Sequence, residues 1–184
     1  AHSLNVAVLS MALAQFSGYS REQIRAIGVA GVLHDIGKVR VPREILVKTG
    51  ALTPAERQAM NEHPRDGAKM ILDSGQADLG LAAVVAYEHH IWYDGRGYPV
   101  VRPPRSCHPA SNLVHVCDVF DALATDRPYR AAWPEARIVD LIKTNSGTEF
   151  DPFPAASFLR MMTQRTPAFR VLDAASLASP ALSL

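Results

Sequence analysis

Seven histidine and aspartate side chains of this 184-residue sequence stand near the ends of apolar segments or within one. They are His2, His34, Asp35, His63, His89, His90 and Asp118. Imidazole nitrogens combined with carboxylate oxygens suit Fe, Mn, Ni or Zn better than Ca or Mg, which prefer oxygen ligands alone. A single histidine on an apolar segment is more often a satisfied core residue, but several with an apolar-flanked aspartate favour a metal site.

The adjacent pair His34-Asp35 supplies a neutral nitrogen and an anionic oxygen to one place, and a carboxylate can bridge two cations. Taken alone, the pair is equally typical of a helix end, where the macrodipole favours a histidine and an aspartate caps the chain. Asp118 lies in the apolar run VHVCDVF, where an unpaired carboxylate would be costly to bury. A bound metal would remove that cost.

The second adjacent pair, His89-His90, follows an apolar segment. Neighbouring residues of an α-helix point about 100° apart, because the helix has ~3.6 residues per turn. If the pair lies on a helix, its two rings are badly placed to bind one ion together. The spacing therefore predicts that His89 and His90 reach different ions of a cluster.

Helical patterns recur along the chain and no two-residue alternation is found, so the predicted fold is all-α. Ser20 with Gln23 forms a capping box that opens a helix, and Gly37 is placed to end it. Thr53, followed by a proline and a glutamate, opens another. Asp78 is placed to cap the segment that delivers the histidine pair.

The chain begins directly in a helical pattern, with Leu4, Val8 and Met11 on one face. From this start we expect a piece cut from a longer polypeptide just inside a helix. Residues 91–109 are rich in Gly and Pro and predict a long, functional loop. We expect one domain over residues 1–164 and a loosely attached tail over residues 165–184.

The composition excludes several classes of protein. Nineteen Lys and Arg oppose eighteen Asp and Glu, and this net charge of +1 argues against a protein that coats nucleic-acid polymers or anionic membranes. The 48% hydrophobic content supports a full core, and no apolar run approaches the ~20 residues of a membrane-spanning helix. Two cysteines form no disulfide framework, so a cytoplasmic location is expected.

Five motifs in order now give a family resemblance. HDIGK at 34–38, HP at 63–64, HH at 89–90, DGRGYP at 94–99 and DVFDALATDRPYR at 118–130 closely resemble the HD-GYP proteins. The resemblance extends from His2 to about Phe153. It implies a compact HD-domain helical bundle with a long GYP loop. It also implies a metal-dependent phosphodiesterase that hydrolyses cyclic di-GMP to pGpG, with GMP as a further product.

The resemblance assigns roles to individual residues. It makes His2, His34, Asp35, His63, His89, His90 and Asp118 the ligands of two divalent transition metals, with a third in some members. Fe or Mn is expected first, and Ni or Zn are the alternatives. Two such cations lower the pKa of the water between them, so a bridging hydroxide attacks phosphorus in line. Asp35 would also orient this hydroxide, and Lys38 would contact the scissile phosphate.

The GYP loop and two arginines are the implied substrate contacts. Tyr98 would lie against a base, while Gly97 and Pro99 shape the loop around it. Arg127 and Arg130 match positions that meet the guanine or its phosphate. Without the family, the same residues would form a turn and two solvated charges. His108 and His115 match no ligand, although His115 precedes Asp118 by three residues and could support the site from outside.

Two departures from the family pattern keep other functions open. Ile91 stands where the family commonly has Glu, and the stretch 100–109 carries Arg102 and Arg105 as a small basic patch. The alternatives are a catalytically weak cyclic-dinucleotide receptor or interaction module, and an HD phosphohydrolase for another nucleotide. No residue visibly excludes cyclic GMP-AMP as substrate. The expected partner domain is an N-terminal sensor or receiver domain.

Overall fold

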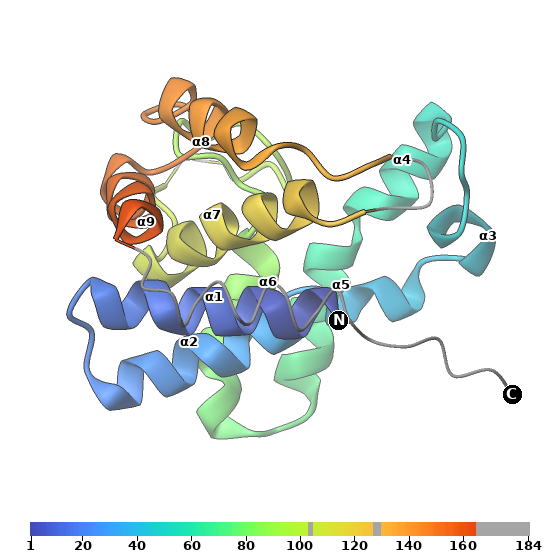
Figure 1. Cartoon of the computed structure of the whole chain (residues 1–184). Coiled ribbons are helices and arrows are strands. Elements are labelled where there is room, and N and C mark those ends of the chain that lie inside the picture. Colours follow the sequence, from blue (N-terminus) through green and yellow to red (C-terminus); the bar gives the residue numbers. More distant parts are fainter. Residues whose placement is uncertain (103–104, 127–129, 165–184) are drawn as a thin grey trace, which may run out of the picture.

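A computed structural model describes residues 1–102, 105–126 and 130–164 and confirms the predicted all-α fold (Figure 1). The elements are α1 (His2–Phe16), α2 (Arg21–Leu33), the 3-10 helix η1 (Ile36–Arg40), α3 (Arg43–Leu46), α4 (Pro54–Asn61), α5 (His63–Asp73), the 3-10 helix η2 (Ala77–Leu79), α6 (Gly80–Glu88), α7 (Pro109–Ala124), α8 (Glu135–Thr144) and α9 (Pro152–Thr163). The predicted tail, residues 165–184, lies outside the described residues. Within the described ranges, each helix is too short or too polar to cross a membrane.

The observed helix starts can be compared with the capping residues predicted from the sequence. The capping boxes at Ser20 and Thr53 are both present, with the backbone N–H of Gln23 and of Glu56 donating to the cap side chains. Asp78 caps no helix, because it lies inside η2 and α6 begins two residues later at Gly80. The predicted side-chain caps are therefore correct at Ser20 and Thr53, where a full box is present, and wrong at Asp78.

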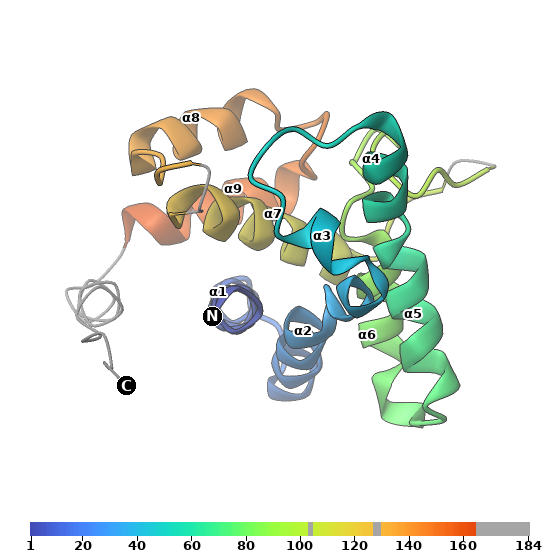
Figure 2. The same ribbon diagram turned by 90° about the vertical axis from the view of Figure 1, so that its right-hand side faces the viewer.

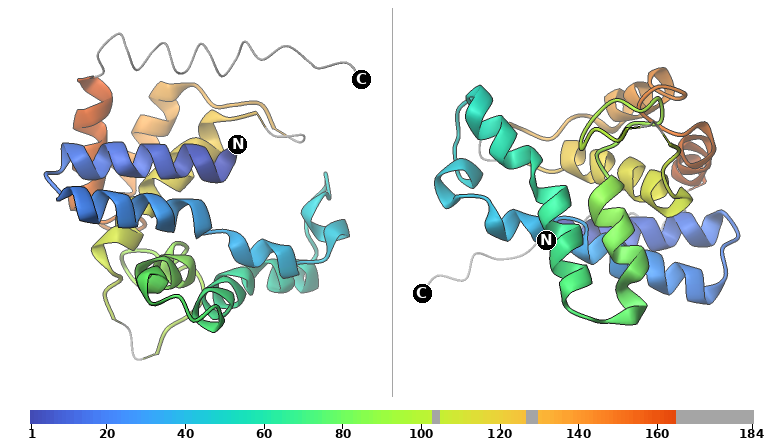
Figure 3. Two further views of the ribbon diagram at one scale, coloured as in Figure 1. Left: turned by 90° about the horizontal axis from the view of Figure 1, so that it is seen from below. Right: turned by 180° about the vertical axis from the view of Figure 1, so that it is seen from behind.

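The helices are arranged around α1. Figure 1 shows α2 and α7 on either side of α1, with α8 and α9 at one end of the molecule and α3 and α4 at the other. Figure 2 looks along α1 from its N-terminal end, and the left view of Figure 3 shows α1 and α2 running side by side. This arrangement brings the first residue of α1 close to the end of α2 and to the middle of α7.

The buried face of α1 is not the one that its large apolar residues suggest. Leu4, Val8 and Met11 are 63%, 48% and 39% exposed. The core face consists of Val6, Ala7, Ser10, Leu13 and Ala14. Apolar residues surround α1 on all sides, so the pattern alone cannot select a face. The helices that pack against α1 select it.

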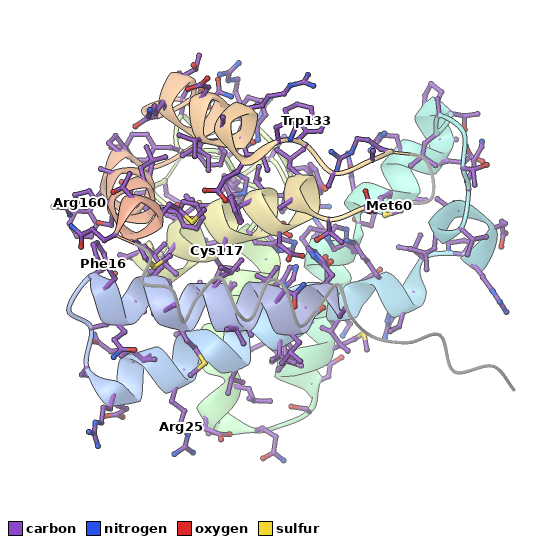
Figure 4. All side chains as sticks on the ribbon, viewed as in Figure 1. Phe16, Arg25, Met60, Cys117, Trp133 and Arg160 are labelled. Atoms are coloured by element: carbon purple, nitrogen blue, oxygen red, sulfur yellow. The ribbon has the colours of Figure 1, made fainter. Side chains whose placement is uncertain are left out.

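The core is centred on α7, which carries ten of the buried residues. Phe120 of α7 packs against Phe158 of α9 with the ring centroids 5.0 Å apart. Cys117 is wholly buried between α7 and α1, as Figure 4 shows, and burial raises the pKa of its thiol to about 12. As predicted, Cys117 is a small packed residue. The buried face of α7 also carries Asp118 into the centre of the molecule.

Gly37 has a different role from the predicted helix end. α2 already ends at Leu33, and Gly37 lies buried in η1, where η1 packs against the start of α5. A Cβ atom at Gly37 would collide with the carbonyl oxygen of His63. Only glycine allows this close approach, and the approach brings the His34-Asp35 pair to His63.

Candidate metal centre

The seven predicted ligands converge from five parts of the chain into two neighbouring groups. The three-ligand group consists of His2, His34 and Asp118, and the four-ligand group consists of Asp35, His63, His89 and His90. Within each group the ligand atoms all lie within 4.8 Å of one another. Residues up to 116 positions apart are thus brought together by the packing of α1, α2, α5, α6 and α7.

Asp35 joins the two groups. Its Oδ2 lies 3.4 Å from Nε2 of His34, in the three-ligand group. Its Oδ1 lies 3.3 Å from Nε2 of His63 and 3.6 Å from Nε2 of His89, both in the four-ligand group. One carboxylate oxygen therefore faces each group, which is the arrangement expected of a carboxylate that bridges two cations.

Two of these ligand atoms have no hydrogen-bond partner although they are buried. They are Nε2 of His34 and Oδ1 of Asp35. A buried polar atom without a partner costs about 1–3 kcal/mol, so native structures rarely leave one unless a ligand satisfies it. Both atoms point into the cluster, and the mixed nitrogen and oxygen donors suit a transition metal. The residues present therefore fit a divalent metal centre.

Backbone carbonyls hold three of the rings in place. The Nδ1–H groups donate to carbonyl oxygens three residues earlier: His34 to Gly31 over 2.7 Å, His63 to Met60 over 2.7 Å and His89 to Ala86 over 2.9 Å. These carbonyls lie in the last turns of α2, α4 and α6, where the helix leaves them without an intrahelical partner. The bonds fix the tautomer and leave each Nε2 available to the cluster.

The helical geometry considered for the pair His89-His90 is absent, and their binding to different ions stays a prediction. Both rings belong to the four-ligand group, and their centroids are 4.0 Å apart. α6 ends at Glu88, so the two histidines lie beyond the helix. The angular spacing of ~100° holds only inside a helix, and the turn that follows α6 brings the rings together.

The electrostatics of the two groups differ. Hydrogen bonds that its ring donates to the carboxylates of Asp118 and Asp121 raise the pKa of His2 to about 9. Burial alone would lower the pKa of His34, but the nearby carboxylates of Asp35 and Asp118 raise it overall. In the four-ligand group, burial lowers the pKa of His89 and holds that of His90 well below its usual value.

Lys38 and Tyr98 lie at the edge of the cluster, as expected of groups that meet a substrate. The ammonium of Lys38 donates to Oδ2 of Asp35 over 2.6 Å and its side chain is 37% exposed. The ring of Tyr98 stands against that of His90, with centroids 4.6 Å apart and planes tilted by 31°. Burial raises the pKa of Tyr98, so its hydroxyl stays protonated.

The turn formed by Gly97, Tyr98 and Pro99 (the GYP turn) holds the Tyr98 ring against the ligand cluster. The backbone N–H of Tyr98 donates to the carbonyl of His90 over 3.1 Å, and a cis peptide bond joins Tyr98 to Pro99. Gly97 has a φ of +83°, and a Cβ there would collide with that same carbonyl oxygen. Gly97 is thus required both by its backbone conformation and by the close approach.

Ile91, the departure from the family pattern, is buried below this turn. It is 6% exposed and forms an isolated antiparallel bridge with Gly97. Hydrogen bonds to a distant segment also hold the loop, because the N–H groups of Tyr93 and Asp94 donate to the carbonyls of Glu149 and Thr148. An apolar residue at position 91 therefore serves the packing of the loop.

The predicted arginine contacts have visible structural partners. Arg130 donates to the carbonyls of Ala122 over 2.6 Å and of Leu123 over 3.4 Å, at the end of α7. Its guanidinium also lies over Trp133, which is labelled in Figure 4. Arg127 lies outside the described residues. Arg105 is no free part of a basic patch, because it pairs with the buried carboxylate of Glu88 over 2.6 Å.

Three supporting residues surround the ligands. Asp121 accepts a hydrogen bond from His2 over 2.6 Å, and His115 donates to the carbonyl of His89 over 2.7 Å. Glu88 accepts from the backbone N–H of His108 and the hydroxyl of Ser111, both over 2.8 Å. Neither Asp121 nor Glu88 has a role predicted from the sequence. Asp121 has one available signal, since it follows Asp118 by three residues and so shares its helix face.

Comparison with known proteins gives one family. The profile of the HD domain family matches residues 2–153. The chain is 36% identical over 152 residues to the cyclic di-GMP phosphodiesterase response regulator RpfG of Xanthomonas campestris, covering 83% of this chain and 40% of that protein. It is 38% identical over 159 residues to the cyclic di-GMP phosphodiesterase PA4108 of Pseudomonas aeruginosa, covering 86% and 38%.

Further matches include a third phosphodiesterase and a solved structure of the same fold. The 3'3'-cGAMP-specific phosphodiesterase 2 of Vibrio cholerae is 32% identical over 83% of this chain and 29% of that protein. Among solved structures, the HD-GYP-type protein Bd1817 of Bdellovibrio bacteriovorus superposes with a TM-score of 0.71 at 20% identity, over 88% of this chain and 51% of that one. The chain thus spans less than half the length of the curated relatives it matches.

Proposed function

Since the chain belongs to the HD domain family, in its HD-GYP branch, we propose that it forms the active site of a metal-dependent cyclic-dinucleotide phosphodiesterase. The observation that carries the proposal is the pair of ligand groups that share the Asp35 carboxylate. The phosphodiesterase activities of the relatives in two bacterial species support it.

The proposed cofactors are two divalent transition metals, one in each ligand group. Fe or Mn is proposed first, because the donors are mainly imidazole with carboxylate, and Ni or Zn are the alternatives. When bound, the metals would supply a hydroxide nucleophile at neutral pH and neutralise the charge that develops on the phosphoryl oxygens. The described residues contain these two groups and no third group of this kind, so two metals are proposed.

The protein side chains have distinct proposed roles. Asp35 holds both groups at a fixed separation and orients the nucleophile. Lys38, which donates to Asp35 in the free site, is within reach of a phosphate oxygen and would neutralise its charge. Tyr98 offers a stacking surface for a base beside His90, with Gly97 and Pro99 shaping the turn.

The two arginines complete the proposed substrate contacts. The guanidinium of Arg130 donates two hydrogen bonds to carbonyls at the end of α7, and these bonds fix its direction. Arg127 is proposed from the motif alone. Both would meet the guanine or its phosphate, since a planar guanidinium suits bidentate contact and stacking.

Cyclic di-GMP is the first proposed substrate, with pGpG as its product and GMP as a second one. Cyclic GMP-AMP is a second candidate, because a relative specific for it is 32% identical to this chain. A regulatory domain in the same polypeptide is proposed from the name of the Xanthomonas relative, a response regulator. A cytoplasmic location agrees with the two free cysteines.

One experiment tests the activity. The protein is loaded anaerobically with Fe or Mn, its metal content is measured, and the products formed from cyclic di-GMP and cyclic GMP-AMP are separated by chromatography. We expect about two ions per chain and hydrolysis of cyclic di-GMP to pGpG. The His34→Ala variant should be inactive, and Asp73→Asn, an exposed change on α5, should match the wild type. Metal-loaded protein that cleaves neither nucleotide would contradict the proposal.

A further inference from the structure

We infer that Asp121 is a positioning residue that aims His2 at the metal of the three-ligand group. The inference rests on the proposed function for the identity of that group. Nδ1 of His2 lies 2.6 Å from Oδ2 of Asp121, while Nε2 of the same ring lies 3.0 Å from Oδ1 of Asp118. One nitrogen is thus held from behind and the other faces the cluster.

His2 needs such a partner because its helix cannot supply one. His34, His63 and His89 lie at or just beyond helix ends, and each donates its Nδ1–H to an unused carbonyl of the preceding turn. His2 is followed by the whole of α1, so the nearby carbonyls are occupied by helical hydrogen bonds. A side chain from another element must hold the ring, and α7 provides it.

The choice of a carboxylate has chemical consequences. A hydrogen bond to an ionised acceptor is stronger than one to a carbonyl, and it makes the opposite ring nitrogen a better metal donor. Asp121 is itself 6% exposed, so water screens this bond little. It lies one helical turn after Asp118, and α7 therefore supplies one metal ligand directly and orients a second.

His2 also needs orientation more than the three fully buried rings do. Its side chain is 22% exposed, whereas those of His34, His63 and His89 are at most 1% exposed. Packing fixes the three buried rings on every side. The ring of His2 meets solvent, so the bond to Asp121 replaces the packing that it lacks.

The test compares Asp121→Asn with Asp140→Asn, an equal change of charge at an exposed position of α8. Metal content is measured for Mn-loaded protein during titration with a chelator, together with hydrolysis of cyclic di-GMP. For Asp121→Asn we expect one of the two ions to be released at chelator concentrations that leave both in Asp140→Asn. Loss of a carboxylate behind a ligating histidine typically weakens metal binding by ~10–100-fold.

Two further variants separate orientation from general support of the fold. In a His2→Ala background, Asp121→Asn should cause no additional loss of metal, because the ring it orients is gone. Asp121→Glu, which keeps the charge, should restore part of the binding. If Asp121→Asn retains both ions at the wild-type chelator midpoint, or if its effect adds fully to that of His2→Ala, the inference is overturned.

The outcomes also separate this inference from the proposed function. If the wild type binds two ions and Asp121→Asn loses one, but neither protein cleaves a cyclic dinucleotide, the positioning role stands and the phosphodiesterase proposal fails. If the wild type cleaves cyclic di-GMP and Asp121→Asn binds metal and reacts like it, only the positioning role fails.

Discussion

The two ligand groups are neighbours but are built in opposite ways. The four-ligand group lies deep in the protein: His63 and His89 are at most 1% exposed, and burial lowers the pKa of His89 and His90. In the three-ligand group, His2 is partly exposed and the acidic residues around it raise its pKa to about 9. The carboxylates therefore favour the charged form of His2, whereas burial favours the neutral forms of His89 and His90.

This contrast bears on how a metal would enter each group. The raised pKa of His2 favours a proton on its ring, between the carboxylates of Asp118 and Asp121. The four-ligand group carries only Asp35, which is shared, and needs fewer protons to balance it. A metal in the three-ligand group must therefore displace protons, whereas one in the four-ligand group meets nitrogens that are already free.

The largest effect is expected from removing the shared ligand, which should erase the difference between the groups. Asp35→Ala deletes the carboxylate that faces both groups, so we expect loss of both ions and a fall in hydrolysis of at least ~10³-fold. Metal analysis and a single-turnover assay measure the two effects. A variant that keeps either ion at full occupancy would show that Asp35 does not join the groups.

Removing a ligand that belongs to only one group should show whether the two groups bind metal independently. Asp118→Ala is expected to lose the ion of the three-ligand group and keep the other, and His63→Ala should do the reverse. Each variant should bind about one ion per chain and lose ~100-fold or more in activity, because hydrolysis uses both metals. Anomalous scattering from Mn-loaded crystals would locate the remaining ion. Loss of both ions from either variant would mean that the groups fill only together.

A smaller effect is expected from the loop beside the four-ligand group. Gly97→Ala forces a Cβ against the carbonyl of His90, whereas Gly95→Ala has the same positive φ and open space around it. Gly95→Ala should cost only the ~1–2 kcal/mol of a left-handed alanine. Gly97→Ala should cost clearly more and also reduce hydrolysis, because Tyr98 must move. Denaturant unfolding of both variants measures this, and equal costs would contradict the close approach.

The smallest effect concerns the metal-free protein and pH. The pKa of His2 is raised on folding, so its stabilising contribution is complete below about 6.5 and is lost as the pH rises through about 9. The pKa values of His89 and His90 are lowered, so their burial costs stability as the pH falls below about 6.5. Thermal unfolding in chelator should show reduced stability on both sides of neutrality. The part of the alkaline loss centred near pH 9 should disappear in His2→Ala, and its persistence there would argue against this origin.

Local chemistry made much of this protein predictable from its sequence. The capping boxes at Ser20 and Thr53 work within one turn, so they need no knowledge of the fold. The ligand set was also visible, because the polar atoms of histidines and aspartates in apolar segments need a partner once they are buried. The family motifs then indicate which of these residues belong together.

Other features depend on which elements pack together. The turn after α6 places His89 and His90 in one group, and the neighbours of α1 decide that Leu4 and Val8 face outward. Gly37 is required by the carbonyl of His63, which no rule for helix ends could indicate.

The side chains that can bind metal, and the starts of the two helices that open with a capping box, can therefore be read from the amino-acid order, since both follow from residue type and from contacts within a turn. The division of the ligands into two groups, and the residue that stands behind each ring, depend instead on how the helices pack. The bond between His2 and Asp121 spans 119 positions of the chain. Its existence depends on α1 lying against α7, and the packing of the whole core sets that contact.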